Sequence, residues 1–182
     1  MSSAYKITNP EGMYYLTATV LGWIDVFTRQ QYRDIILDSI KYCQDNRGLQ
    51  LHAWVIMSNH MHLIASSEKG DLSGIMRDMK KHTSKKIVTD IKANEQESRK
   101  EWMLSMFSNA GKYNNDNEEY QFWRKGNQPK ELETHEFAMQ KLNYIHNNPV
   151  RAGIVEEPEH YLYSSARDYA GVKGLLDVVF LT

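Results

Sequence analysis

The sequence contains little cysteine and no long apolar run, and both absences narrow the class of protein. Cys43 is the only cysteine, which excludes an internal disulfide and fits a reducing cytosol. No apolar run approaches the roughly 20 residues of a membrane span. The N-terminal residues lack the basic and apolar regions of a signal peptide. We therefore expect a cytoplasmic protein with no membrane partner.

An excess of positive charge is also lacking. The 22 Lys and Arg residues are balanced by 23 Asp and Glu residues, for a formal net charge of −1 at pH 7. This balance argues against a protein coated with phosphate-binding side chains, so any nucleic-acid surface must be local. The length of 182 residues is sufficient for one domain with a proper core, and we expect residues 1–182 to form a single domain.

Hydrophobic periodicity in the first half of the chain predicts both strands and helices. Residues 13–20 have the composition of a strand, and residues 51–66 read as two short strands joined at Ser58 and Asn59. Helical spacing predicts a helix over 28–46, with Thr28 as its cap and Gly48 just past its end. A second helix is predicted over 71–92.

The second half of the chain is less regular. Residues 94–119 are polar and predict a mobile loop or insertion, and residues 120–123 predict a fourth strand. A last helix is predicted to begin near Thr134, which is a suitable N-cap residue. We expect it to end near Asn148, because Pro149 disfavours helical geometry in the residue before it.

The order of these elements, β-α-β-β-α-β-α, is typical of one fold class. It predicts an α+β protein with a ferredoxin-like, RRM-like antiparallel sheet and helices packed on one face. Residues 156–182 would be a C-terminal extension built from turns and short segments. Such sheets occur in RNA-recognition modules and in nucleases, so the fold alone does not select a function.

Two histidines at the start of the second strand of the 51–66 pair are the first candidate site residues. Because strand side chains alternate between faces, His60 and His62 share one face, and Met61 between them points to the other. This pattern can place two metal ligands on a rigid sheet, although two surface histidines on a strand are the commoner case. Zn²⁺ is not favoured, because no further cysteine or histidine follows at recognisable spacing.

Basic residues are concentrated in the helix predicted over 71–92. Such a run is usually a solvated face, but it follows the histidine pair directly and could guide a phosphate backbone toward it. With one arginine of the later FWRKGNQP segment, the candidate DNA-binding residues are Arg77, Lys80, Lys81, Lys85, Lys86 and Arg124.

The last predicted helix presents a second candidate pair. Tyr144 and Asn148 are four residues apart and so lie on the same flank, beside the buried stripe formed by Ala138, Leu142 and Ile145. The alternative interpretation is a half-buried tyrosine that needs a hydrogen bond and an asparagine that merely ends the helix.

Two segments together resemble a known protein family. The segment IMSNHMHLI resembles the HUH motif (His, hydrophobic, His) of single-tyrosine transposases, and KLNYIHNNPVRAGIV resembles their tyrosine helix. The chain is most similar to the REP-associated tyrosine transposases, which are relatives of the insertion-sequence transposases that act on single-stranded DNA. The similarity extends to TSKKI, FWRKGNQP and PEHYLYSSARDYA. One departure is Ser58, where relatives usually have proline, and it alters the turn rather than the ligands.

The resemblance implies a fold, a chemistry and roles for the candidate residues. It implies an HUH endonuclease palm in which His60, His62 and Asn148 bind a divalent metal, Mg²⁺ or Mn²⁺, and Tyr144 is the nucleophile. The reaction would nick and rejoin single-stranded, hairpin-forming DNA through a 5′-phosphotyrosine. Both a monomer and a homodimer remain open.

Two other functions are compatible with the same elements. One is a catalytically inactive, single-stranded nucleic-acid-binding module of the same fold. The other is an RNA-binding domain of the RNA-recognition type, which would need a Lys/Arg-Gly-Phe-Gly-Phe-like strand that this chain lacks.

Overall fold

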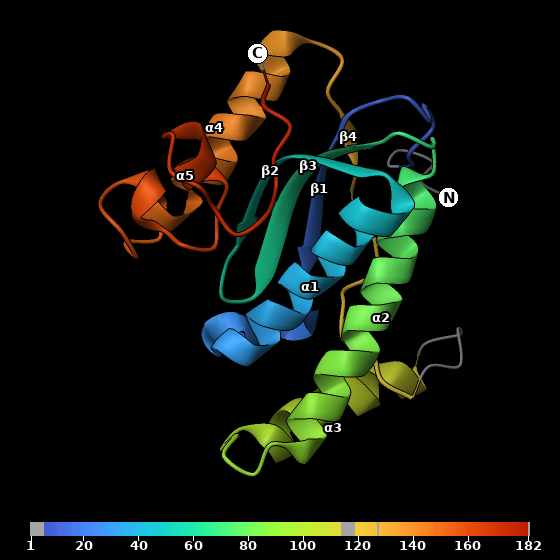
Figure 1. The fold of residues 1–182 in the computed structure, drawn as a ribbon. Coiled ribbons are helices and arrows are strands. Elements are labelled where there is room, and N and C mark those ends of the chain that lie inside the picture. Colours follow the sequence, from blue (N-terminus) through green and yellow to red (C-terminus); the bar gives the residue numbers. More distant parts are fainter. Residues whose placement is uncertain (1–5, 114–118, 127, 182) are drawn as a thin grey trace.

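The computed structural model describes residues 6–113, 119–126 and 128–181. At its centre is a four-stranded sheet in the order β2-β3-β1-β4, in which neighbouring strands are antiparallel. The strands are β1 (Tyr14–Thr19), β2 (Leu49–Ile56), β3 (His60–Ser67) and β4 (Lys130–Glu131). This arrangement confirms the predicted α+β, ferredoxin-like antiparallel sheet (Figure 1).

The register of β3 decides which side chains surround the histidines. Thr17 of β1 pairs with His62, and so does Val55 of β2 from the other side. Directly paired residues project from the same face of a sheet, so His60 and His62 share their face with Thr17 and Val55. Met61 points to the opposite face, where it is only 1% exposed within the main core.

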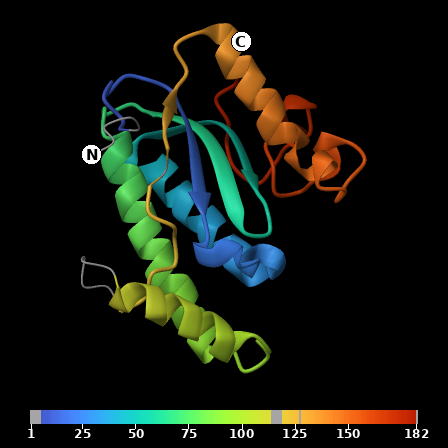
Figure 2. The same cartoon turned by 180° about the vertical axis from the view of Figure 1, so that it is seen from behind.

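Two helices, α1 (Gln30–Arg47) and α2 (Leu72–Ala93), cover the face of the sheet that carries Met61. Figures 1 and 2 show them side by side against that face. Their apolar stripes form the main core with the inward residues of the strands, which include Leu16, Ile36, Ile40, Met61, Leu63, Ile75 and Met79. Burial of this continuous apolar surface is the dominant force that holds the helices to the sheet.

The last helix, α4 (His135–Arg151), lies on the other face of the sheet. The predicted stripe Ala138, Leu142 and Ile145 is buried, and it packs in a second core with Val55 and Ile64. The expectation that the helices pack on one face therefore applies to α1 and α2 but not to α4. The physical reason is that the histidine face also carries large apolar side chains, which need a cover of their own.

The predicted helix caps agree with the structure at Gly48 and Thr134 but not at Thr28. Gly48 ends α1 with a φ of 74°, a left-handed conformation that glycine adopts readily. Thr134 caps α4, where its side chain accepts a hydrogen bond from the Phe137 N–H. Thr28 is not a cap, because α1 begins only at Gln30, and the Thr28 hydroxyl instead donates to the Asp25 carbonyl.

The end of α4 differs from the prediction, because the helix continues through Pro149 to Arg151. Proline removes one N–H from the helix, but here the loss falls in the last turns and the helical hydrogen bonding resumes after it. The Ala152 N–H still donates to the Asn148 carbonyl at 3.0 Å. Burial of the Pro149 ring adds apolar contact. Asn148 therefore keeps helical geometry one turn beyond Tyr144.

The segment predicted as a mobile loop over 94–119 contains a helix, α3 (Lys100–Lys112). Met103, Phe107 and Gly111 form its buried stripe at i, i+4 and i+8, and α3 packs on α2. The stripe is narrow and the surrounding residues are polar, so composition alone indicates a loop. The part of the prediction that concerns residues 114–118 lies outside the described residues.

The approach to α3 is fixed by a buried carboxylate. Glu97 is only 3% exposed, and its oxygens lie 2.6 Å from Arg29 Nε and 3.2 Å from Arg99 Nε. The two guanidinium groups hold the pKa of the Glu97 carboxyl below its ordinary value against the opposing effect of burial. Arg29 precedes α1, so this ion pair network joins α3 to the start of α1.

The fourth strand is not at residues 120–123, as predicted, but at Lys130–Glu131, where it pairs with Tyr14 and Tyr15. Residues 120–123 contribute only an isolated bridge between Trp123 and Val20. Gly126 and Gln128 have positive φ values of 80° and 40°, and such residues interrupt a strand. The chain therefore runs along β1 but pairs with it only at its two ends.

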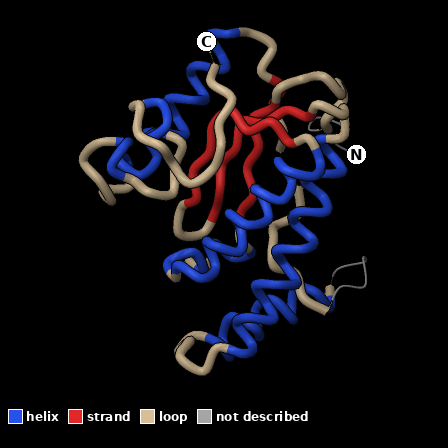
Figure 3. Tube along the Cα trace, in the orientation of Figure 1, coloured by secondary structure: helices blue, strands red, loops and turns tan. Residues whose placement is uncertain are grey.

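The C-terminal segment, which Figure 3 shows largely as loop, covers the free edge of β2. It contains η3 (Pro158–His160) and α5 (Ala166–Tyr169), and Val179 N–H donates to the Leu51 carbonyl at 2.9 Å. The Ser165 hydroxyl lies 2.9 Å from His146 Nε2 of α4 and accepts from the Trp54 N–H at 2.9 Å. These contacts fasten α4 to the sheet.

Across the described part of the chain, no helix combines the length and the apolar character that crossing a membrane requires.

Candidate functional site

The two predicted histidines lie together at the beginning of β3. Their ring centroids are 4.8 Å apart, at an angle of 70°. His62 is 5% exposed, whereas His60, the first residue of β3, is half-buried. The alternation of β3 and the anchoring of Met61 in the opposite core explain why both imidazoles project from one face. The predicted His-x-His geometry is therefore present.

Each imidazole is held through its Nδ1 atom. His60 Nδ1 lies 2.7 Å from the Asn59 side-chain oxygen. His62 Nδ1 lies 2.8 Å from the Tyr15 hydroxyl and 2.9 Å from the Thr17 hydroxyl. Such partners orient a metal-binding histidine. The Asn59 oxygen can only accept a hydrogen bond, so neutral His60 carries its proton on Nδ1 and leaves Nε2 for a ligand, and the two hydroxyls hold the His62 ring through Nδ1.

Burial keeps this part of the site uncharged. Desolvation lowers the pKa of His62 to about 3, and the neighbouring His60 adds to the effect. The pKa of His60 is also lowered, by burial alone. Burial raises the pKa of Tyr15 to about 12, so its hydroxyl stays protonated. Neutral imidazoles are the form that binds metals, and burial favours that form at both histidines.

Tyr144 lies beside the histidine pair. Its ring centroid is 5.5 Å from that of His62 and 6.3 Å from that of Tyr15. The side chain is 36% exposed, so a ligand can reach it. Two cations flank the ring: Lys141 Nζ is 5.7 Å and Arg151 Cζ is 5.5 Å from its centroid.

Asn148, the fourth predicted site residue, is on the same helix one turn after Tyr144. Its side-chain Nδ2 donates to the Tyr144 carbonyl at 2.8 Å, and its side-chain oxygen accepts no hydrogen bond from any described residue. No cluster of three His, Cys, Asp or Glu side chains able to hold a metal occurs within the ranges that the structure describes. The oxygens in contact with the two imidazoles are those of the Asn59 amide and the Tyr15 and Thr17 hydroxyls, and mixed nitrogen and oxygen donors suit Mg²⁺ or Mn²⁺.

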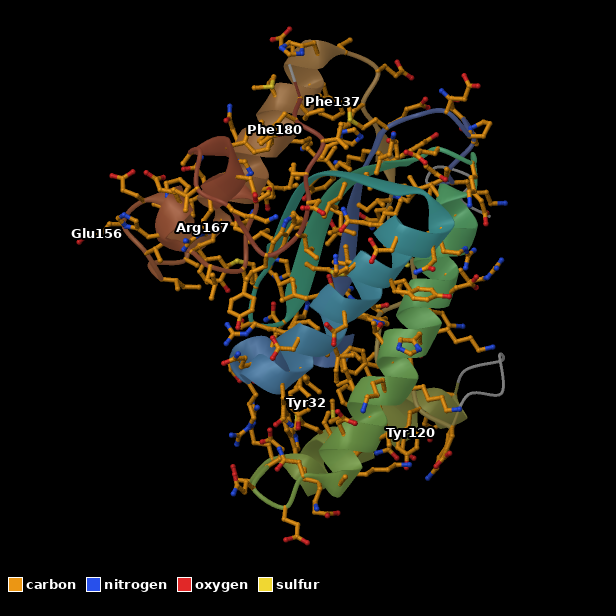
Figure 4. All side chains as sticks on the ribbon, in the orientation of Figure 1. Tyr32, Tyr120, Phe137, Glu156, Arg167 and Phe180 are labelled. Atoms are coloured by element: carbon orange, nitrogen blue, oxygen red, sulfur yellow. The ribbon has the colours of Figure 1, made fainter. Side chains whose placement is uncertain are left out.

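The predicted DNA-binding residues gather along a groove, here called the basic groove, between α2 and residues 119–126. It has a volume of about 790 Å³. Its cationic lining residues are Arg77, Lys80, Lys81, Lys85, Lys92, Arg124 and Lys125, and Glu119 is the one carboxylate among the described lining residues. In Figure 4 the labelled Tyr120 marks this groove and the labelled Phe137 marks α4.

One predicted residue lies outside the groove. Lys86 is four residues from Asp90 on α2, and its Nζ lies 2.7 Å from the Asp90 carboxylate. Arg77 lines the groove but is also paired, with its Nε 2.9 Å from Asp78 Oδ1. The structure thus brings together five of the six predicted basic residues.

Sequence reasoning missed the residues that support the histidines. Tyr15 and Thr17 are two residues apart on β1. The rule that places His60 and His62 on one face of their strand also places these two residues on one face of theirs. Trp23, whose ring centroid is 6.0 Å from that of His60, follows a turn and has no such signal.

Comparisons with known proteins address the fold and the family. The family model described as "Transposase IS200 like" matches residues 19–120, more than half of the chain. This range includes both histidines and ends before Tyr144. None of the curated proteins matches.

Among solved structures, the chain is similar to one described as "Structure of the REP associates tyrosine transposase bound to a REP hairpin". The TM-score is 0.64 at 19% sequence identity, and the match covers 100% of this chain and 94% of the other. At this identity the likeness establishes a shared fold over the whole length of the chain.

Proposed function

The chain belongs to the IS200-like transposase family, and from that premise we propose that it nicks and rejoins single-stranded, hairpin-forming DNA through a 5′-phosphotyrosine. The observation that carries the proposal is the position of Tyr144 beside His62, with ring centroids 5.5 Å apart. The tyrosine and the histidines come from segments that are distant in the sequence. Their meeting on one face of the sheet is what a tyrosine-dependent phosphodiester cleavage requires.

Tyr144 would act as the nucleophile. Its phenolic oxygen attacks the scissile phosphorus and loses its proton to solvent, and a new O–P bond forms as the bond to the 3′-oxygen breaks. The leaving 3′-oxygen takes up a proton and becomes a free 3′-hydroxyl, while the 5′-phosphate stays on the tyrosine. The phosphodiester energy is conserved for rejoining.

His60, His62 and Asn148 would hold the divalent ion. When bound, such an ion polarises the scissile phosphate and neutralises its charge. The chain's own contribution is orientation: Asn59 holds the His60 ring, and Tyr15 and Thr17 hold the His62 ring. Because these hydrogen bonds already hold both rings, little further ordering would be needed on binding.

The basic groove would bind the phosphate backbone of the DNA. Its cations come from α2 and from residues 119–126, and the REP hairpin to which the similar transposase is bound supports a hairpin as the substrate. Lysine and arginine side chains that neutralise phosphates release counterions, so affinity should fall steeply with salt. Arg124 lines the groove and also connects it to the histidines. Its guanidinium carbon is 5.3 Å from the Trp23 ring centroid, and the Trp23 ring lies beside His60.

The second candidate function is a catalytically inactive module that binds single-stranded nucleic acid. The basic groove alone would suffice for it, and that observation favours it over any function without nucleic acid. A binding function does not explain the arrangement of His60, His62 and Tyr144. A binding module needs neither two neutral imidazoles with oriented Nδ1 atoms nor a tyrosine between two cations.

One experiment separates the two functions. The protein is incubated with end-labelled hairpin oligonucleotides that carry single-stranded tails, in the presence of Mn²⁺, and is then analysed by denaturing electrophoresis. We expect a denaturation-resistant protein–DNA adduct that is absent from Tyr144→Phe, although that variant binds the hairpin as before. Tyr42→Phe is the matched control, because Tyr42 is 60% exposed on α1, away from the histidines. An adduct in Tyr144→Phe, or none in the unmodified protein, would refute the proposal.

A further inference from the structure

Trp23 has an unusual backbone and an unusual exposure. Its φ is 58°, one of two positive values among the described non-glycine residues, and it directly follows Gly22 with a φ of 62°. The left-handed region is unfavourable for a bulky L-residue and is often retained for function. The side chain is nevertheless 56% exposed, so core packing does not account for a tryptophan at this position.

The turn that carries Trp23 is tied to the histidine pair. The Asn59 side-chain Nδ2 donates to the Trp23 carbonyl at 3.1 Å, and the oxygen of the same amide lies 2.7 Å from His60 Nδ1. Trp23 N–H donates to the Val20 carbonyl at 3.1 Å, directly beyond β1. One asparagine thus fixes both the His60 ring and the backbone that presents Trp23.

The surroundings of the Trp23 ring combine an open aromatic surface with positive charge. Its centroid is 6.0 Å from that of His60, at an angle of 77°. The guanidinium carbon of Arg124, which lines the basic groove, is 5.3 Å from the ring centroid. Trp23 therefore lies where the groove meets the histidine pair, which is where a DNA strand would pass from backbone binding to cleavage.

We propose that Trp23 stacks on the base of the nucleotide immediately 5′ to the scissile phosphate; this placement rests on the proposed function. Phosphoryl transfer places the attacking and leaving oxygens roughly in line. Tyr144 contacts His62, whereas Trp23 contacts His60. A phosphate held at the histidines and attacked by Tyr144 then has its leaving 3′-oxygen directed toward Trp23. The sugar and base attached to that oxygen come within reach of the indole.

A nucleobase fits this surface better than an apolar partner does. Aromatic side chains beside cations are the usual platform for single-stranded nucleic acid, because every base has a π face and the phosphate meets the cation. Arg124 supplies the cation: its guanidinium carbon lies over the indole ring, 5.3 Å from the centroid, and leaves the opposite face for a base. Since stacking does not read base edges, Trp23 should tolerate any base, with stronger stacking for purines.

The test uses the Tyr144→Phe protein, which should bind without cleaving. The probe is a hairpin oligonucleotide with a thymidine tail in which a single 2-aminopurine is moved from position to position. Stacking quenches 2-aminopurine fluorescence. We expect quenching at one position that is lost when Trp23→Ala is added and partly retained with Trp23→Phe. At that position, Trp23→Ala should lower the affinity by roughly 5- to 150-fold, which corresponds to the range known for aromatic stacking of one base.

An abasic nucleotide at the same position provides a double-mutant cycle. If Trp23 acts through the base, Trp23→Ala should not lower the affinity for the abasic strand any further. Equal losses on both strands would make Trp23 a structural residue and overturn the inference, and so would an absence of any Trp23-dependent quenching. Tyr42→Ala, which removes another exposed aromatic ring, should leave the quenching unchanged.

The cleavage position is measured separately, by mapping the DNA end in the adduct of the unmodified protein. A cut directly 3′ to the responding nucleotide supports the placement, and a cut elsewhere refutes it. If no adduct forms while Trp23-dependent quenching persists, the nicking function and the placement beside a scissile phosphate both fail, and only the stacking of Trp23 on a base stands.

Discussion

The orientation of His62 depends on two hydroxyl groups, and their removal should weaken metal binding without disturbing the fold. Tyr15→Phe and Thr17→Val each delete one hydroxyl and preserve the shape of the side chain. In the structure these hydroxyls lie 2.8 and 2.9 Å from His62 Nδ1. The Tyr15 ring remains in the second core, so apolar packing is retained in both variants.

The expected loss of Mn²⁺ affinity depends on the hydrogen bonds that His62 Nδ1 keeps in each variant. With one hydroxyl removed, the other still orients the ring, and the loss should be close to the net value of one hydrogen bond, about 1 kcal/mol, or roughly fivefold in affinity. With both removed, Nδ1 of a side chain that is 5% exposed has no partner. An unsatisfied buried group costs about 1–3 kcal/mol, and loss of such supporting partners typically lowers metal affinity about 10- to 100-fold.

The assay is calorimetric titration with Mn²⁺, supported by thermal unfolding of each variant without metal. Thr19→Val is the matched control, because Thr19 lies on the same strand opposite His60 and its hydroxyl has no hydrogen bond with a described residue. We expect the Mn²⁺ affinity to decrease from the control to the single variants and from these to the double variant. The loss of binding free energy in the double variant should exceed the sum of the two single losses. Mn²⁺ affinity that is unchanged in the double variant would refute the assignment of His62 as an oriented ligand.

The proposed site leads to three further predictions. Because burial lowers the pKa of Lys80 to about 8, its positive charge should be largely present at pH 7 and lost by pH 9, so affinity for hairpin DNA should fall over this range. Lys80→Arg should hold that affinity to pH 9, and an identical pH profile in both proteins would contradict the reasoning. Asn148→Ala should raise, and Asn148→Asp lower, the Mn²⁺ concentration needed for half-maximal adduct formation, whereas superimposable titrations would remove Asn148 from the site. A mixture of Tyr144→Phe with a His60→Ala, His62→Ala protein should form no adduct when each chain completes its own site, and adduct formation would instead indicate a homodimer that exchanges α4.

Features that depend on neighbouring residues could be predicted from the sequence. The alternation of His60 and His62 is set by the period of a strand, and Met61 decides which face they take. The cap at Thr134 and the left-handed end at Gly48 depend on local backbone geometry. The resemblance carried by the two histidines and the tyrosine helix is confirmed at the level of the family.

Errors arose where local signals were weak or outweighed. The α3 stripe has few apolar residues, so a polar composition hid a helix that packing on α2 stabilises. Residues 120–123 have the composition of a strand, but the irregular backbone at Gly126 and Gln128 moves the ladder to Lys130–Glu131. Pro149 does not end α4 at Asn148, because a proline near a helix end costs only one hydrogen bond and its ring is buried here.

The sequence by itself therefore determined the chemical groups of the site and the face or flank on which each would lie. Only the tertiary structure decided that α4 crosses to the histidine face and sets Tyr144 against His62, and that Arg124 and Trp23 join the basic groove to His60. Faces and flanks follow from backbone periods of two or 3.6 residues, which adjacent residues impose. Contacts between distant segments depend instead on strand register and on which apolar surfaces bury each other, and no local period contains that information.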